Sequence, residues 1–196
     1  MKVALIGGTG PFGSALAARL QAAGDSVAVG SRDAARAAAA AAGLGVEGGS
    51  NQEIVRGVDL AVLAVKASAA LETVSALSLE SPLLSVASEV GYSGDDVRSL
   101  AERVAELVSV PVVAGLHSLA AGKLADEPPD EDAFVCGDDA DAKELALELA
   151  GKLVAGRAVD AGPLRSARAL EAMTTVLIAV NRRYRAHVGL RVTGLP

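Results

Sequence analysis

The sequence predicts an α/β fold with a doubly wound, mostly parallel sheet, extended by a small C-terminal α/β part that ends in a long helix. Short apolar runs alternate with segments of helical periodicity over residues 1–125. Parallel strands need such crossover segments, and helices on both faces bury them completely. A glycine-rich turn directly follows the first run and opens the first helical segment. Together these observations favour an open sheet with helices on both sides.

The strand predictions rest on aliphatic and β-branched runs bounded by turn residues. Five such runs predict strands at Lys2–Gly7, Ser26–Gly30, Leu60–Val65, Pro82–Val86 and Val112–Leu116. The first helix is expected from about Gly13 to Ala23, because Gly24 can adopt the left-handed conformation that ends helices. A second helix is expected to begin near Asp33, whose side chain can cap it, and to continue through the alanine run that follows.

The pattern changes after residue 125, so we expect a main domain over residues 1–125 and a small extension over residues 126–196 packed on it. The extension is predicted to hold a short strand at "FVCG", a helix from about Asp139 to Leu153 and a short strand at "RAVDAG". A long helix is expected from Pro163, with an apolar stripe made of Leu170, Met173, Leu177, Val180 and Tyr184. Such a stripe indicates packing against the main domain or a subunit interface.

Composition excludes several classes of function. The net charge of −6 and the pI near 5.0 argue against nucleic acid as a partner, because phosphate backbones need clustered Lys and Arg. No stretch approaches the roughly 18 uncharged apolar residues of a membrane-spanning helix, and no secretory signal is recognisable. The single Cys136 can form no internal disulfide, and two histidines predict no structural zinc site. These features favour a soluble, cytoplasmic protein.

The first chemical motif is the segment "IGGTGPFG". Gly8, Gly10 and Gly13 have the spacing G-x-G-x-x-G after a strand and at the start of a helix. In that context glycines permit a tight turn, close approach of the backbone to a pyrophosphate and close helix packing, and the helix N-terminus stabilises the negative charge. Thr9 adds a hydroxyl donor at the same place. The motif predicts a dinucleotide-binding Rossmann unit; the alternative is a glycine turn without a nucleotide.

The end of the second predicted strand indicates which dinucleotide binds. An acidic side chain there would accept hydrogen bonds from the ribose hydroxyls of NAD and would repel the 2′-phosphate of NADP. This chain has Gly30, Ser31 and Arg32 instead, and Arg36 lies one helical turn further on. Ser31, Arg32 and Arg36 offer donors and positive charge, so we expect a clamp for the 2′-phosphate of NADP(H). The alternative is that the two arginines are solvated surface charges.

Five segments spread over nearly the whole chain carry a family resemblance: "KVALIGGTGPFGSALAARLQAAGDSVAVGSRD", "VDLAVLAV", "VVAGLHSLAA", "FVCGDD" and "VDAGPLRSAR". They contain GGTGxxG with GSR, LH followed by a small polar residue, VCGDD, and DAGPL with a downstream arginine. In this order and spacing they resemble the NADPH-dependent F420 reductases, small Rossmann proteins that pass a hydride between NADP and the deazaflavin coenzyme F420.

The resemblance implies that NADP(H) and coenzyme F420 meet in a cleft at the C-terminal ends of the strands, and that the protein is a homodimer. The protein then mainly supplies positioning, because both cofactors carry their own reactivity. His117 matches the family's histidine and is the candidate catalytic residue, either contacting the deazaflavin or fixing its loop by hydrogen bonding. The expected cofactor-binding residues are Gly8, Thr9, Gly10, Phe12, Gly13, Ser31, Arg32, Arg36, Val65 and Lys66.

One stretch departs from the family where the deazaflavin is expected. After "LAVLAV" the family usually continues with proline and a bulky residue, whereas this chain has Lys66 followed by Ala67, Ser68 and Ala69. Compared with the family, this stretch of the chain has smaller side chains and one additional positive charge, that of Lys66. Two alternatives to F420 reduction therefore stay open: an NADPH reductase of another acceptor such as an imine, ketone or flavin, and a non-catalytic NADP-binding module.

Several residues outside these motifs are also expected to lie in or near the site, in the core or on the surface. A basic patch for the anionic tail of F420 is expected among Lys66, Lys123 and Arg165, and the acidic stretch "DEPPDEDA" is expected to be a solvated rim. Cys136 is predicted to be a buried structural thiol and His187 to lie on the surface. Further pocket candidates are Val86, Glu89 and Tyr92.

Overall fold

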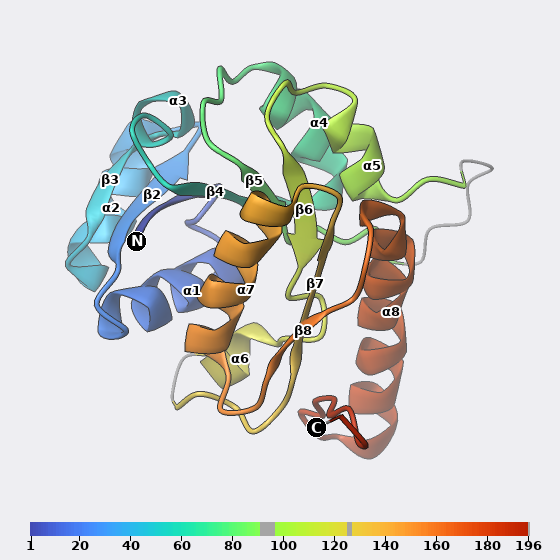
Figure 1. Ribbon diagram of the computed structural model, residues 1–196. Coiled ribbons are helices and arrows are strands. Elements are labelled where there is room, and N and C mark those ends of the chain that lie inside the picture. Colours follow the sequence, from blue (N-terminus) through green and yellow to red (C-terminus); the bar gives the residue numbers. More distant parts are fainter. Residues whose placement is uncertain (91–96, 125–126, 196) are drawn as a thin grey trace.

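The computed structural model describes residues 1–90, 97–124 and 127–195. In this part of the chain one eight-stranded sheet carries helices on both faces (Figure 1). The strands are β1 (Lys2–Ile6), β2 (Ser26–Ser31), β3 (Glu47–Ser50), β4 (Leu60–Leu63), β5 (Leu83–Ser85), β6 (Val112–Gly115), β7 (Ala133–Gly137) and β8 (Ala158–Asp160). The helices are α1 (Pro11–Ala22), α2 (Ala34–Leu44), α3 (Asn51–Ile54), α4 (Ala67–Ser75), α5 (Leu100–Ala105), α6 (Ala121–Leu124), α7 (Ala140–Leu153) and α8 (Ala167–Tyr184).

The strand order β3-β2-β1-β4-β5-β6-β7-β8 confirms the doubly wound prediction. Neighbouring strands are parallel except for β6 and β7, which are antiparallel. The order reverses direction at β1, whose two neighbours are β2 and β4. Open α/β sheets bind ligands at such a switch point, outside the C-terminal ends of the strands.

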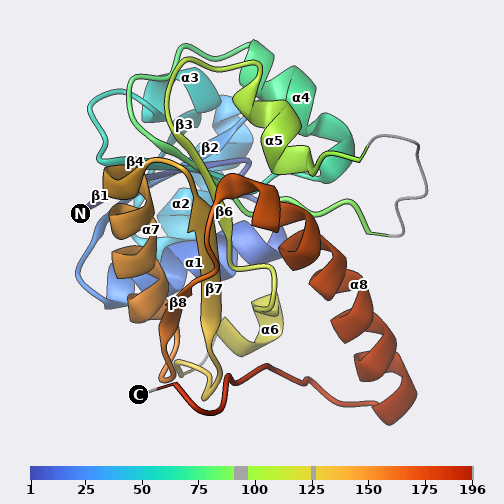
Figure 2. The same cartoon turned by 45° about the vertical axis from the view of Figure 1, so that its right-hand side comes forward.

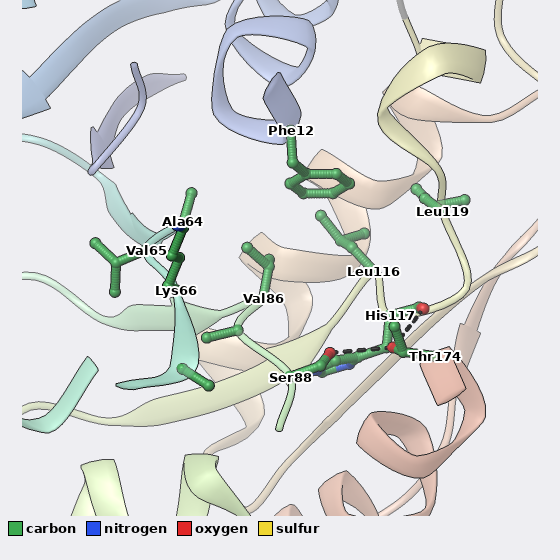
Figure 3. A pocket seen from close by; sticks show the side chains of 12 residues that line it. Phe12, Ala64, Val65, Lys66, Val86, Ser88, Leu116, His117, Leu119 and Thr174 are labelled. Carbon is green, nitrogen blue, oxygen red and sulfur yellow. Dashed lines mark hydrogen bonds between the residues drawn. The ribbon is translucent and has the colours of Figure 1, made fainter. Parts of the chain in front are cut away.

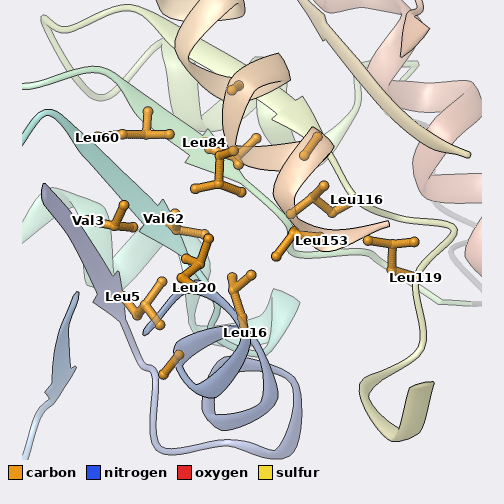
Figure 4. Close-up of a cluster of buried hydrophobic side chains, with 14 of the residues drawn as sticks. Val3, Leu5, Leu16, Leu20, Leu60, Val62, Leu84, Leu116, Leu119 and Leu153 are labelled. Carbon is orange, nitrogen blue, oxygen red and sulfur yellow. The ribbon is translucent and has the colours of Figure 1, made fainter. Parts of the chain in front are cut away.

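Two apolar layers hold the helices to the sheet. On one face α1 and α7 bury a cluster that includes Leu5, Leu16 and Leu153 (Figure 4). On the other face α3, α4, α5 and the start of α8 pack around residues such as Ile6 and Leu63. Each fully buried leucine contributes roughly 1.5–3 kcal/mol to the free energy of unfolding, so both layers stabilise the fold.

The predicted elements are largely confirmed, with differences at helix starts and one missed strand. The first helix begins at Pro11 and not near Gly13, because proline is well suited to the first helical turn, where its missing N–H is no loss. Gly24 after it has φ +87°, as expected for a helix-ending glycine. Asp33 caps α2 by accepting hydrogen bonds from the backbone N–H groups of Ala35 and Arg36. A short 3₁₀ turn, Leu164–Ser166, precedes the terminal helix expected from Pro163.

Strand β3 was not predicted, because its sequence "EGGS" contains no β-former. The strand forms where it does because Gly48 lets α2 approach the sheet. A Cβ atom on Gly48 would lie 2.6 Å from the Cβ atom of Ala41.

The C-terminal part continues the same sheet, since β7 pairs with β6 and β8 pairs with β7. The division into residues 1–125 and 126–196 therefore stays a prediction. The acidic loop is the expected solvated rim only in its first part: Glu127 and Asp130 are exposed, whereas Glu131 and Asp132 are buried. The Asp132 carboxylate accepts hydrogen bonds from the backbone N–H groups of Val192 and Arg157, at 2.7 and 2.8 Å, and pairs with the Arg157 guanidinium. The prediction is wrong for Glu131 and Asp132 because this end of the loop binds the C-terminal tail.

The terminal helix α8 is only partly packed. Leu170 and Leu177 of the predicted stripe are buried, whereas Tyr184 near the end is 69% exposed. The second half of α8 extends away from the sheet (Figure 2). The Glu171 carboxylate fixes the first half by accepting hydrogen bonds from the backbone N–H groups of Leu100 and Ala101 at the start of α5. Among the described helices, none is long and apolar enough to cross a membrane.

Candidate active site

A cleft of about 710 Å³ lies at the C-terminal ends of β1, β2 and β4, where the strand order reverses. We call it the dinucleotide cleft. It is lined by Gly7, Thr9, Gly10, Pro11, Phe12, Ser31, Arg32, Arg36, Asn51, Ala64, Val65, Lys66, Ser68, Ala69 and Thr73. The structure therefore brings together eight of the ten residues proposed from the sequence to bind the cofactor.

The other two, Gly8 and Gly13, lie beneath the cleft surface and pack against each other. A Cβ atom on Gly13 would lie 2.6 Å from the Cα atom of Gly8, so the pair lets α1 approach β1 closely. The left-handed turn at the end of β1 is made by Gly7, with φ +74°, which lies outside the G-x-G-x-x-G motif. Gly7 is thus a site residue that the motif alone did not identify.

The end of β2 supplies the groups expected for a phosphate. Arg32 and Arg36 are exposed and face the dinucleotide cleft, and within the described residues neither guanidinium group pairs with a carboxylate. The Ser31 hydroxyl oxygen accepts a hydrogen bond from the Asp33 N–H at 3.2 Å. Its own O–H group is therefore available as a donor. Two unpaired cations and a free hydroxyl donor form a site that suits a dianionic phosphate.

A second hollow of about 230 Å³ adjoins the cleft at the ends of β4, β5 and β6 (Figure 3). We call it the acceptor hollow. It shares Phe12, Ala64, Val65 and Lys66 with the dinucleotide cleft, so the two spaces meet at these residues. The remaining lining residues are Ala67, Val86, Ala87, Ser88, Leu116, His117, Leu119 and Thr174. Apolar side chains dominate this lining, which suits a flat, largely apolar ring.

His117 lies in the wall of the acceptor hollow and is only 6% exposed. Burial lowers its pKa to about 4, and a weak contact with the backbone of Ala87 opposes the shift. The imidazole is therefore neutral at neutral pH. Both ring nitrogens are buried, and within the described residues neither forms a hydrogen bond of good geometry.

The backbone before His117 is strained. Leu116 has φ +65°, a left-handed conformation that is unfavourable for a leucine. This residue turns the chain at the end of β6, and its side chain is buried in the wall of the acceptor hollow. The conformation places Leu116 and His117 side by side in that wall (Figure 3).

Two hydroxyl residues of the acceptor hollow were not found from the sequence. Thr174 of α8 donates a hydrogen bond to the carbonyl oxygen of His117, and its Oγ1 lies 3.0 Å from the Ser88 Oγ (Figure 3). Neither residue belongs to a recognisable motif. Only the packing of α8 against the ends of β5 and β6 brings them together.

The other residues predicted to line the pocket or to form a basic patch are only partly brought into the site. Val86 lines the acceptor hollow, Glu89 forms an ion pair with Arg103, and Tyr92 lies outside the described residues. Of the three proposed basic-patch residues, Lys66 lines the hollow, whereas Lys123 pairs with Glu131 at 2.7 Å and Arg165 is not among the lining residues.

The predictions for the thiol and for the second histidine are confirmed. Cys136 is a fully buried free thiol whose pKa is raised to about 12, mainly by burial, which makes it unreactive. His187 is exposed.

The fold and the site define a class: a doubly wound dinucleotide-binding protein with room for a second small molecule beside the dinucleotide. A family model described as NADP oxidoreductase, coenzyme F420-dependent, matches residues 2–89. The F420-dependent NADP reductase of Methanothermobacter thermautotrophicus is 36% identical over 225 aligned positions, which cover 100% of this chain and 96% of the relative. The chain belongs to the F420-dependent NADP reductase family.

Solved structures show the same fold. A protein from Arthrobacter assigned to the F420-dependent NADP reductases has a TM-score of 0.81 at 23% identity, covering 98% of this chain and 99% of its own. An imine reductase from Streptomyces aurantiacus has a TM-score of 0.62 at 25% identity, and the alignment covers 93% of this chain and 62% of the reductase. The shared architecture thus extends to reductases of other acceptors.

Proposed function

We propose that this protein transfers a hydride between NADPH and the deazaflavin coenzyme F420. The observation that carries the proposal is the junction of the two spaces at Phe12, Ala64, Val65 and Lys66. A dinucleotide extended along the cleft would place its reactive end there, next to a ring in the acceptor hollow. The full-length relatives named as F420-dependent NADP reductases support the same reaction.

The dinucleotide cleft fits NADP better than NAD. Ser31, Arg32 and Arg36 would hold the 2′-phosphate, and the end of β2 carries no carboxylate that would repel it. Thr9 and the backbone at Gly10 face the same cleft and would hold the pyrophosphate. A Cβ atom on Gly10 would find no atom nearer than 3.9 Å, so open space lies in front of this backbone. Phe12, Val65 and Lys66 would border the nicotinamide.

In the reaction, the nicotinamide C4 supplies a hydride to the deazaflavin C5, and a proton from water completes the reduced acceptor. The protein's own contribution is position and exclusion of water. Phe12, Leu116 and Leu119 would cover one ring, and the neutral His117 would border it without introducing charge. We assign His117 as the residue that contacts the acceptor.

A reductase of imines or related acceptors is the second candidate. It is supported by the likeness to the imine reductase and by the small side chains at Ala67 and Ala69. Reduction of an imine also requires a proton donor at the substrate nitrogen. Among the described residues that line the acceptor hollow, only Lys66 and His117 carry titratable groups, and His117 is held neutral. An imine reductase would therefore need Lys66 as its proton donor.

We also infer a homodimer in the cytoplasm. Val176 is 60% exposed and Tyr184 is 69% exposed on the projecting part of α8, which leaves apolar surface for a second copy. A free buried thiol in Cys136 suits a reducing compartment. Sedimentation as a dimer, lost in a Val176→Arg variant, is the expected result; a monomer at all working concentrations contradicts the dimer. Fractionation of the source cells tests the compartment.

The experiment that tests the function mixes purified protein with NADPH and oxidised F420 and follows the loss of the deazaflavin absorbance. NADH in a parallel sample tests the phosphate clamp, and a cyclic imine tests the second candidate. Loss of absorbance with NADPH but not with NADH is expected. If the imine is reduced and F420 is not, the second candidate replaces the first. If NADPH binds and no acceptor is reduced, the non-catalytic alternative holds.

A further inference from the structure

Asn51 contacts both segments that line the dinucleotide cleft, the glycine turn after β1 and the end of β2. It is the first residue of α3 and follows Ser50, which caps this helix in a reciprocal arrangement with Glu53. The Asn51 side chain is buried, with only 7% of the residue exposed. Its Oδ1 accepts a hydrogen bond of 3.2 Å from the backbone N–H of Gly7, the residue that turns the chain at the end of β1. Asn51 therefore fixes the glycine loop from outside that loop.

Gly30 at the end of β2 makes this position possible. A Cβ atom on Gly30 would lie 2.6 Å from the Asn51 Oδ1 and 2.8 Å from the Ile54 Cδ1. Any larger residue at position 30 would push α3 away from the ends of β1 and β2. The glycine that precedes Ser31 and Arg32 thus serves the packing of Asn51, in addition to leaving the end of β2 without an acidic side chain.

The hydrogen bond from Gly7 also determines how the Asn51 amide is oriented. A backbone N–H needs an acceptor, so the oxygen of the amide faces Gly7 and the Nδ2 group, with two donors, faces elsewhere. Within the described residues no group accepts a hydrogen bond from Nδ2. Asn51 lines both the dinucleotide cleft and an adjoining recess of about 220 Å³ that includes Ser31, Arg32 and Thr73. The donors of a buried amide are thus presented to the adenosine end of the cleft.

We propose that Asn51 contacts the cofactor directly: its Oδ1 holds the Gly7 turn while its Nδ2 donates a hydrogen bond to a sugar or phosphate oxygen in the adenosine half of NADPH. The proposal rests on NADPH being the ligand of this cleft. In this proposal the Asn51 side chain has two tasks. Its oxygen holds the Gly7 turn of the pyrophosphate loop, and its nitrogen binds the adenosine half of the ligand. Loss of the donor weakens binding even when the loop is intact.

Two substitutions separate these tasks. Asn51→Asp keeps an oxygen for the Gly7 N–H but replaces the donors with an acceptor and a negative charge. Asn51→Ala removes both. Gln52→Ala is the matched control on the same helix, because the Gln52 amide is bonded to the backbone of Ser78 and does not line the cleft. Thermal unfolding of each variant reports whether the Gly7 turn and α3 are still held.

Binding is measured without any acceptor, by titrating the full chain with NADPH and with adenosine 2′,5′-bisphosphate. We expect Asn51→Asp to weaken both ligands by about tenfold or more while its thermal midpoint stays close to that of the wild type, and Gln52→Ala to leave both affinities unchanged. Wild-type affinity in Asn51→Asp overturns the donor role of Asn51 and leaves the proposed function standing. Failure of the wild-type protein to bind NADPH overturns the proposed function, and the Asn51 proposal with it.

Discussion

The hydroxyl group of Thr174 donates a hydrogen bond of 3.0 Å to the backbone carbonyl oxygen of His117, which ties α8 to the loop after β6. The same hydroxyl oxygen lies 3.0 Å from the Ser88 Oγ. Because Thr174 has one hydroxyl proton and uses it on His117, Ser88 is the donor in this second bond. Three segments that are distant in the sequence thus meet at one oxygen atom in the acceptor hollow.

Replacing Thr174 with valine removes both hydrogen bonds and keeps the shape of the side chain. We expect a loss of about 1–3 kcal/mol in the free energy of unfolding, because the His117 carbonyl and the Ser88 hydroxyl lose their partner. We also expect a raised KM for F420 with little change in the affinity for NADPH, since Thr174 lines the acceptor hollow and is not among the residues of the dinucleotide cleft. Steady-state kinetics and urea unfolding measure the two effects.

Thr174→Ser is the control for this prediction, because serine keeps the hydroxyl group. It should retain most of the stability and most of the F420 affinity. Equal losses in the serine and valine variants would show that the methyl group, and not the hydroxyl, matters at this position.

Replacing Arg32 or Arg36 with alanine tests the phosphate clamp. Each substitution should raise the KM for NADPH by about tenfold to a hundredfold, the range of a charge-assisted hydrogen bond, and should leave the weak use of NADH unchanged. The value of kcat should change little, because the groups bind the ligand far from the transferred hydride. Kinetics with both nucleotides measure this difference.

Arg56→Ala controls for the loss of surface charge, since Arg56 is exposed after α3 and is not among the residues of the dinucleotide cleft. Unchanged NADPH affinity in the Arg32 and Arg36 variants would show that the two guanidinium groups are solvated surface charges.

The buried His117 predicts a dependence of stability on pH. Its pKa is about 4 in the folded protein and 6.5 in an unperturbed histidine, so the unfolded chain binds more protons between these values. The free energy of unfolding therefore rises with pH through this window and is lost as the pH falls through it, by up to about 3 kcal/mol in total. Urea unfolding at several pH values between 4 and 7 measures the slope.

His117→Leu should reduce that slope, and His187→Gln, at an exposed position, is the matched control for the loss of a histidine. The comparison between variants removes the contributions of carboxylates that titrate in the same range. If the slope is identical in the wild type and in His117→Leu, the lowered pKa of His117 is not the source of the pH dependence.

Asp132 is predicted to anchor the C-terminal tail. Hydrogen bonds from the Val192 and Arg157 N–H groups, together with the Arg157 guanidinium, lower the pKa of this carboxyl to about 2. Asp132→Asn removes the charge and places an amide donor against other donors, so we expect a loss of about 1–3 kcal/mol in the free energy of unfolding. Hydrogen exchange of residues 188–195 should increase.

Asp130→Asn is the matched control, since Asp130 is exposed and forms a surface ion pair with Arg191. If residues 188–195 stay protected from hydrogen exchange in Asp132→Asn, the buried carboxylate does not anchor the C-terminal tail. The stability supplied by Asp132 should also be lost as the pH falls from about 4 towards 2, because its folded pKa lies below the ordinary value.

The sequence by itself predicted the fold class and the residues of the proposed phosphate clamp, because both depend on local patterns. The alternation of strands and helices, the turn after β1 and the GSR segment at the end of β2 are each contained in a short stretch of chain. Eight of the ten proposed cofactor residues reach one cleft, since the C-terminal ends of parallel strands meet at the same edge of the sheet.

Only the tertiary structure decided which further residues enter the site and which polar residues are buried. Thr174, Ser88 and Asn51 have no motif, and they enter the site because α8 and α3 pack against the ends of particular strands. The burial of Asp132, the partial exposure of α8 and the existence of the glycine-rich β3 likewise depend on neighbours far away in the sequence. Local patterns report propensity and periodicity, whereas burial and pairing are properties of contacts that form only when the whole chain has folded.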